Sequence, residues 1–132
     1  MKIILVDAIN GLFFKDGTIF DEMYQLLETY PNQKIVLTGA NDEQFKQFKL
    51  DQSPYEVFTL KHNPEKTDPE YFKIMLKKFG LTADGVIFFE HSADAVKSAE
   101  SVGIKTYFYD HTKQDLVALK DFLDANCDIR FI

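Results

Sequence analysis

Short apolar runs alternate with amphipathic stretches along most of the chain, and this rhythm limits the fold more than any other feature. Each run is rich in Val, Ile and Phe and lacks an alternating polar face, which is typical of parallel strands covered on both sides. The stretches between the runs have helical spacing, so the sequence predicts repeated βαβ units. We expect an α/β fold, a Rossmann-like three-layer sandwich with a five-stranded parallel sheet. The expected strands span residues 3–6, 34–37, 57–60, 86–89 and 105–109.

The stretches between these strands carry start and stop signals for helices. Residues 21–30 place apolar side chains three and four positions apart, as an amphipathic helix requires. Residues 68–79 follow Thr67, which has capping-box spacing to Glu70, and Gly80 is placed to end this helix. The residues placed to start the other three helices are Asn41, Ser92 and Thr112.

The segment after the first strand departs from this rhythm. Residues 12–14 and 18–20 are two short apolar runs that flank Lys15, Asp16 and Gly17. The Asp-Gly pair is a strong signal for a tight turn. We therefore expect a small flap hairpin directly after the first strand.

Size and composition favour one globular domain over residues 1–132. A chain of 132 residues with 45% hydrophobic residues can bury an ordinary core without metals or disulfides. No apolar run is long enough for a membrane span, and the apolar start is interrupted by Asp7, unlike a signal peptide. The single cysteine, Cys127, cannot form an internal disulfide, so we expect a soluble cytoplasmic protein. The net charge of −6 argues against nucleic acid or a membrane as partner.

Polar residues stand where the predicted strands end. In an open parallel sheet, ligands bind beyond the carboxyl ends of the strands, near the point where the strand order reverses. The side chains at these ends are therefore the candidates for a functional site. They are Asp7, Thr38, the stretch 61–66 with Lys61 and Lys66, Glu90 with His91, and Asp110.

Four motifs occur in a fixed order. ILVDAINGLFFKDG carries Asp7 after the first strand, and VLTGAND carries Thr38 after the second. NPEKTDPEYF carries Lys66 before a helix, and FFEHSADAVKSAESVGIKT carries Glu90 before an Ala-rich helix that ends at a glycine. This order resembles the haloacid dehalogenase-like (HAD-like) hydrolase superfamily, from residue 2 to about residue 109.

The resemblance implies a role for each motif. Asp7 would be the nucleophile that forms a covalent aspartyl intermediate. Thr38 would hydrogen-bond an oxygen of the transferred group, and Lys66 would neutralise charge between nucleophile and substrate. Asn10 and Gly39 would contribute to substrate binding.

A magnesium ion is the cofactor that the resemblance implies. Its oxygen ligands would be the Asp7 carboxylate, the backbone carbonyl of Ile9, the Glu90 carboxylate and waters. Glu90 is the acidic residue of the fourth motif that could serve in this way. The sequence therefore predicts a Mg²⁺ site, weakened for the reasons that follow.

Two departures from the family pattern bear on activity. Ile9 stands where phosphatases of the family carry a second Asp, which transfers a proton in rate-accelerating acid–base catalysis. His91 replaces the second carboxylate of the fourth motif, and Mg²⁺ prefers oxygen to imidazole. The DAINGLFF run is also similar to the dehalogenase branch, which uses no metal but needs a helical cap. The chain has no room for such a cap, so we expect a capless, open site.

Two functions remain open from the sequence. One is a HAD-like hydrolase with weak or altered phosphatase-type activity through Asp7. The other is a catalytically inactive HAD-like protein that binds a phosphorylated small molecule or protein, with a protein partner able to cover the open site. A response-regulator domain is disfavoured, because its acceptor Asp follows the third strand. The sequence does not decide between Lys61 and Lys66 for the site.

Overall fold

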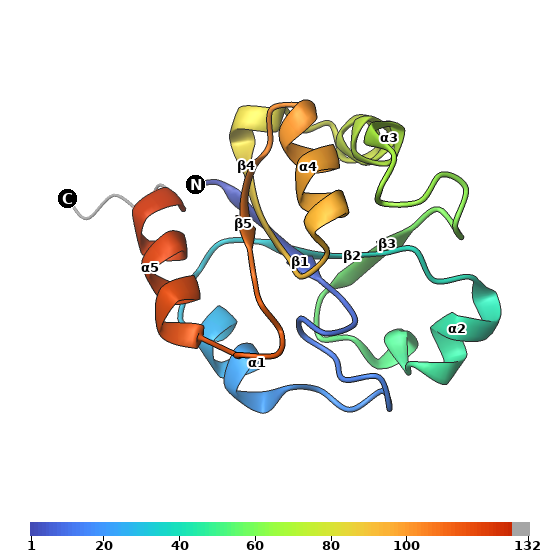
Figure 1. The fold of residues 1–132 in the computed structure, drawn as a ribbon, viewed down its shortest axis with the longest axis horizontal. Coiled ribbons are helices and arrows are strands. Elements are labelled where there is room, and N and C mark those ends of the chain that lie inside the picture. Colours follow the sequence, from blue (N-terminus) through green and yellow to red (C-terminus); the bar gives the residue numbers. More distant parts are fainter. Residues whose placement is uncertain (128–132) are drawn as a thin grey trace.

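The computed structural model describes residues 1–127, which form a five-stranded parallel sheet in the order β3-β2-β1-β4-β5 (Figure 1). This architecture confirms the predicted fold class. Successive strands run from β1 outward to β3 and then return to the other side of β1, so the strand order reverses between β1 and β4. The strands are β1 (Ile3–Asp7), β2 (Lys34–Thr38), β3 (Glu56–Thr59), β4 (Val86–Glu90) and β5 (Lys105–Phe108).

Helices cover both faces of the sheet, which gives three layers. Helices α3 and α4 lie on one face, and α1 and α5 lie on the other (Figure 1). None of the helices in residues 1–127 is long and apolar enough to cross a membrane. The helices are α1 (Asp21–Glu28), α2 (Asp42–Gln47), α3 (Pro69–Phe79), α4 (Ala93–Ser101) and α5 (Leu116–Asn126), with short 3₁₀ turns η1 (Leu50–Gln52) and η2 (Ala83–Gly85).

The core divides into two clusters because side chains alternate along each strand. On β1, Ile4 and Val6 pack with α1 and α5, whereas Leu5 packs with α3 and α4. All three side chains are fully buried. A strand covered on both faces needs apolar residues at every position, which explains the unbroken apolar run.

Two of the five predicted helix starts were wrong. Helix α3 is capped by Asp68 in place of Thr67, because the Asp68 side chain accepts the Glu70 N–H at 3.0 Å. Helix α5 is capped by Asp115, whose side chain accepts the Ala118 N–H. The predicted start at Thr112 lies in a turn instead, where Asp110 binds both its N–H and its hydroxyl.

The starts predicted at Asn41 and Ser92 are confirmed, and so is the end at Gly80. Asn41 forms a reciprocal capping box with Gln44 on α2. Ser92 accepts the Ala95 N–H at the start of α4. Gly80 ends α3 in the left-handed conformation with φ of 65°.

The two arms of the predicted flap hairpin, residues 12–14 and 18–20, pair with each other, although too briefly to form regular strands. Phe13 and Ile19 form one isolated antiparallel bridge, and Gly17, with φ of 86°, makes the tight turn. Backbone hydrogen bonds of 2.8 Å on either side of this bridge join residues 12–14 to residues 18–20, and Phe13 N–H donates to the Ala8 carbonyl at 2.9 Å. The predicted hairpin is therefore confirmed as a short paired turn that is also anchored to the end of β1.

Candidate active site

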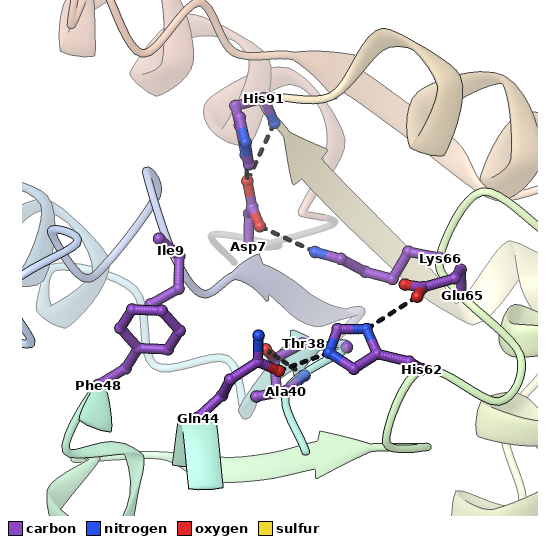
Figure 2. A pocket seen from close by; sticks show the side chains of 11 residues that line it. Asp7, Ile9, Thr38, Ala40, Gln44, Phe48, His62, Glu65, Lys66 and His91 are labelled. Atoms are coloured by element: carbon purple, nitrogen blue, oxygen red, sulfur yellow. Dashed lines mark hydrogen bonds and ion pairs between the residues drawn. The ribbon is translucent and has the colours of Figure 1, made fainter. Parts of the chain in front are cut away.

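The carboxyl ends of the central strands bring the predicted polar side chains together at one edge of the sheet (Figure 2). Asp7, Thr38 and Glu90 are the last residues of β1, β2 and β4. Lys66 comes from the loop before α3 and reaches across to the end of β1. Because β1 lies between β2 and β4, Asp7 is at the centre of the group.

Asp7 is held at both carboxylate oxygens. Its side chain is buried, and Oδ1 accepts a hydrogen bond from Lys66 Nζ at 2.9 Å. Oδ2 accepts the backbone N–H of His91 at 3.0 Å and makes a second, short hydrogen bond with the imidazole Nδ1 of the same residue. Figure 2 shows Lys66 and His91 approaching the carboxylate from different sides.

Lys66 is saturated by its neighbours. In addition to Asp7, its Nζ lies 2.6 Å from Glu90 Oε1 and 3.3 Å from the Leu37 carbonyl. An ammonium group has three hydrogens, so each has an acceptor within the protein. The side chain is only 15% exposed.

Glu90 is fully buried behind this contact and is also held at both oxygens. Oε1 accepts from Lys66, and Oε2 accepts the Ser92 N–H at 3.0 Å. The same Oε2 lies 3.2 Å from His91 Nδ1. Each carboxylate oxygen of Asp7 and Glu90 therefore faces at least one N–H donor.

These contacts shift pKa values in directions set by burial and by charge. Burial would raise the pKa of Asp7, but the Lys66 charge and the His91 hydrogen bond outweigh it and hold that pKa far below 3.8. Burial would lower the pKa of Lys66, but the charges of Asp7 and Glu90 keep it above 10.5. Burial also opposes protonation of His91, yet its hydrogen bonds to the two carboxylates raise its pKa to about 9. Asp7, Lys66 and His91 are therefore all ionised at neutral pH.

A pocket of about 230 Å³ opens over Asp7. Its apolar side contains Ile9 and Phe48, and Thr38 lies on the side nearest β2 (Figure 2). The Thr38 hydroxyl oxygen accepts the Ala40 N–H at 3.2 Å. The lining residues are Asp7, Ile9, Thr38, Gly39, Ala40, Gln44, Phe48, His62, Glu65, Lys66 and His91.

The structure places most of the predicted site residues around this pocket. Asp7, Thr38, Gly39 and Lys66 line it, and so does the Ile9 side chain. Glu90 lies behind Lys66 and is not a lining residue. Asn10, with φ of 68°, is also outside the lining, and its side-chain amide lies 3.5 Å from His91 Nε2.

Lys61 is directed away from the pocket. Its Nζ pairs with Asp42 at 3.0 Å, and 59% of its side chain is exposed. Of the two lysines that the sequence left open, Lys66 is therefore the one at Asp7.

One wall of the pocket was not predicted from the sequence. His62 Nδ1 lies 2.8 Å from Glu65 Oε1, and its Nε2 contacts the side chain of Gln44 (Figure 2). The stretch 61–66 was a candidate from the sequence, but neither His62 nor Glu65 was singled out within it. The only available signal was position, because Gln44 follows β2 and the other two follow β3, both at the carboxyl edge.

The residues present do not fit Mg²⁺. One ligand atom from each of Asp7, Glu90 and His91 lies within 4.8 Å of the others, which is close enough for the three residues to share a metal ion. However, the oxygens of the two carboxylates already face Lys66, His91 and backbone N–H groups, and the third group offers nitrogen. Mg²⁺ requires a near-octahedral oxygen shell.

The fold resembles that of solved structures described as HAD family or HAD-superfamily proteins. A magnesium complex of a HAD family enzyme from Bacteroides thetaiotaomicron aligns with a TM-score of 0.65 and 17% identity over 90% of this chain and 98% of that one. A HAD-superfamily hydrolase of subfamily IA from Geobacter sulfurreducens aligns with a TM-score of 0.62 and 15% identity, over 91% of this chain and 96% of that one. A third structure is an Asp-to-Ala mutant of the same Bacteroides enzyme in complex with magnesium and inorganic phosphate. It aligns with a TM-score of 0.56 and 22% identity over 67% of this chain.

This chain spans 51% of the length of the third structure. No protein-family model matches the sequence, and no curated protein matches it significantly. The likeness therefore rests on the three-dimensional arrangement, in which Asp7, Thr38 and Glu90 end the neighbouring strands β1, β2 and β4. The chain has the fold of the haloacid dehalogenase superfamily.

Proposed function

We propose that this protein binds the phosphoryl group of a phosphorylated small molecule or protein in the pocket over Asp7, without efficient hydrolysis. One observation carries the proposal: both oxygens of Asp7 are engaged, by Lys66 on one side and His91 on the other, while Ile9 stands at the position of the proton-transfer Asp. The pocket of a hydrolase fold is retained, but its reactive group is restrained.

The restraint acts on Asp7 as a nucleophile. Strong hydrogen bonds to both oxygens and the neighbouring Lys66 charge stabilise the carboxylate, and a more stabilised anion is a weaker attacking group. Ile9 cannot protonate a leaving oxygen or activate water. Loss of such acid–base assistance costs on the order of 10² to 10⁴ in rate.

The pocket still offers contacts to a phosphoryl group. The Thr38 hydroxyl is buried, and within residues 1–127 its own hydrogen has no acceptor. Lys66 and His91 offset the charges of the Asp7 and Glu90 carboxylates at the pocket floor, so a phosphoryl group would not meet two uncompensated anions there. The HAD family enzyme that was solved with inorganic phosphate supports this class of ligand, because its fold is the same.

The organisation of the chain suits an open site. We propose that residues 1–132 are one domain without a cap, as the sequence indicates. Between β1 and β3, residues 8–55 contain only loops, α1, β2, α2 and η1. A phosphorylated side chain on a protein partner could therefore enter as readily as a small molecule.

Slow hydrolysis through Asp7 is the second candidate. It is favoured by the 2.9 Å contact between Asp7 and Lys66, and by Thr38 lining the same pocket. In that reaction Asp7 would take the phosphoryl group while the ester oxygen departs with a proton from water. Water would then release phosphate from Asp7.

The test combines binding with turnover. Inorganic phosphate is titrated into the ¹⁵N-labelled protein, and we expect amide shifts near Asp7, Thr38 and Gly39 that weaken in Thr38→Val. An absence of shifts at this edge would sink the binding proposal. Hydrolysis of an aryl phosphate is then compared with Asp7→Asn: equal background rates are expected, and a higher rate in the natural protein would favour the second candidate.

A further inference from the structure

We infer that the His91 side chain occupies the place between Asp7 and Glu90 where the family pattern puts a divalent cation, so that the site needs no metal. The second half of this inference, binding of phosphate without metal, rests on the proposed function. The first half concerns only the arrangement of His91 and the two carboxylates.

The position of Nδ1 carries the inference. The atom contacts Asp7 Oδ2 through a short hydrogen bond and lies 3.2 Å from Glu90 Oε2. It therefore bridges one oxygen of each carboxylate. Lys66 Nζ bridges the other two oxygens, at 2.9 Å from Asp7 and 2.6 Å from Glu90. The two carboxylates are joined by a nitrogen donor on each side.

Backbone donors reinforce this arrangement. The His91 N–H points at Asp7 Oδ2 and the Ser92 N–H at Glu90 Oε2, each at 3.0 Å. Ser92 caps α4, so the start of that helix fixes the direction of both groups. These two backbone N–H groups are fixed in direction, so a cation bound to the same oxygens would have to compete with them.

The imidazole ring is held in place as well. The ring of His111 packs edge-on at a centroid distance of 5.0 Å, and the Asn10 amide lies 3.5 Å from Nε2. Nδ1 carries a hydrogen both in the imidazolium and in the neutral Nδ1–H tautomer, so the bridge forms in either state. The side chain is only 25% exposed.

Mn²⁺ binding, followed by electron paramagnetic resonance on the full chain, tests the first half. Mn²⁺ prefers oxygen ligands as Mg²⁺ does. We expect the natural protein to show no Mn²⁺ binding that Asp7→Asn removes. His91→Asp should gain a Mn²⁺ site, with a dissociation constant at least about tenfold below that of any residual Mn²⁺ binding by the natural protein. A natural protein that binds Mn²⁺ through Asp7 would overturn the inference, and this arm needs no folded His91 variant.

Phosphate titration with EDTA, and again with excess Mg²⁺, tests the second half. We expect the same dissociation constant in both, whereas a tenfold or greater gain with Mg²⁺ would contradict the inference. If phosphate binds in neither condition, the proposed function fails together with this second half. The Mn²⁺ experiment still decides whether His91 fills the cation position, so the two failures are distinguishable.

Discussion

Gly11 lies directly against the backbone of Asp7. A Cβ atom at Gly11 would overlap the Asp7 carbonyl oxygen and come within 3.0 Å of Asp7 Cβ. The same carbonyl accepts the Leu12 N–H at 3.0 Å, which closes the turn after β1. The close approach of this turn, and with it the position of the Asp7 side chain, therefore requires glycine.

Gly11→Ala should destabilise the protein by about 2 kcal/mol or more, because the added methyl group meets backbone that cannot move aside. Urea unfolding followed by circular dichroism measures the free energy of unfolding. Gly85→Ala is the matched control: its nearest neighbour would be the Thr82 hydroxyl at 3.2 Å, a side chain that can shift. Similar losses in both variants would contradict the prediction.

Lys66→Met should cost roughly 3 to 5 kcal/mol of unfolding free energy, because it leaves two buried carboxylates without their shared cation. Lys61→Met should cost less than about 1 kcal/mol, since the Lys61–Asp42 pair is exposed to solvent. Chemical denaturation of both variants checks this. Equal effects would mean that Lys66 does not hold Asp7 and Glu90 together.

Stability should fall as the pH rises from about 6.5 to 9. The folded-state pKa of His91 is raised from 6.5 to about 9, so its stabilisation is complete below pH 6.5 and is lost as the pH rises through 9. A shift of this size corresponds to about 3 kcal/mol. Unfolding free energies measured across this range in the natural protein and in His91→Gln provide the check, and parallel curves would refute the assignment.

Restoring two carboxylates should create phosphatase activity. Ile9→Asp supplies a proton-transfer group, and His91→Asp supplies an oxygen ligand in place of imidazole. We expect the double variant with Mg²⁺ to hydrolyse an aryl phosphate on the order of 10²-fold faster than the natural protein. Addition of Asp7→Asn should remove the gain. A gain that survives this third change would show that Asp7 is not the nucleophile.

The sequence alone was sufficient to predict the strands and helices and to place the site at the carboxyl ends of the strands. Unbroken apolar runs at 3–6 and 86–89 predict buried parallel strands, and the next polar residues, Asp7 and Glu90, must then stand at their carboxyl ends. Asn41 and Ser92 were found as helix caps for a similar reason. A cap depends on side-chain chemistry within three residues, which the sequence displays directly.

The partners of these residues were decided only by the tertiary structure. His91 meets Asp7 across 84 residues of sequence because β4 pairs with β1, and nothing local to either residue encodes that contact. Lys61 and Lys66 share one loop, yet left-handed backbone at Lys61 and His62 turns the chain so that only Lys66 reaches Asp7. Local patterns determine where a strand or helix begins and ends, whereas packing of distant elements determines which charges face one another.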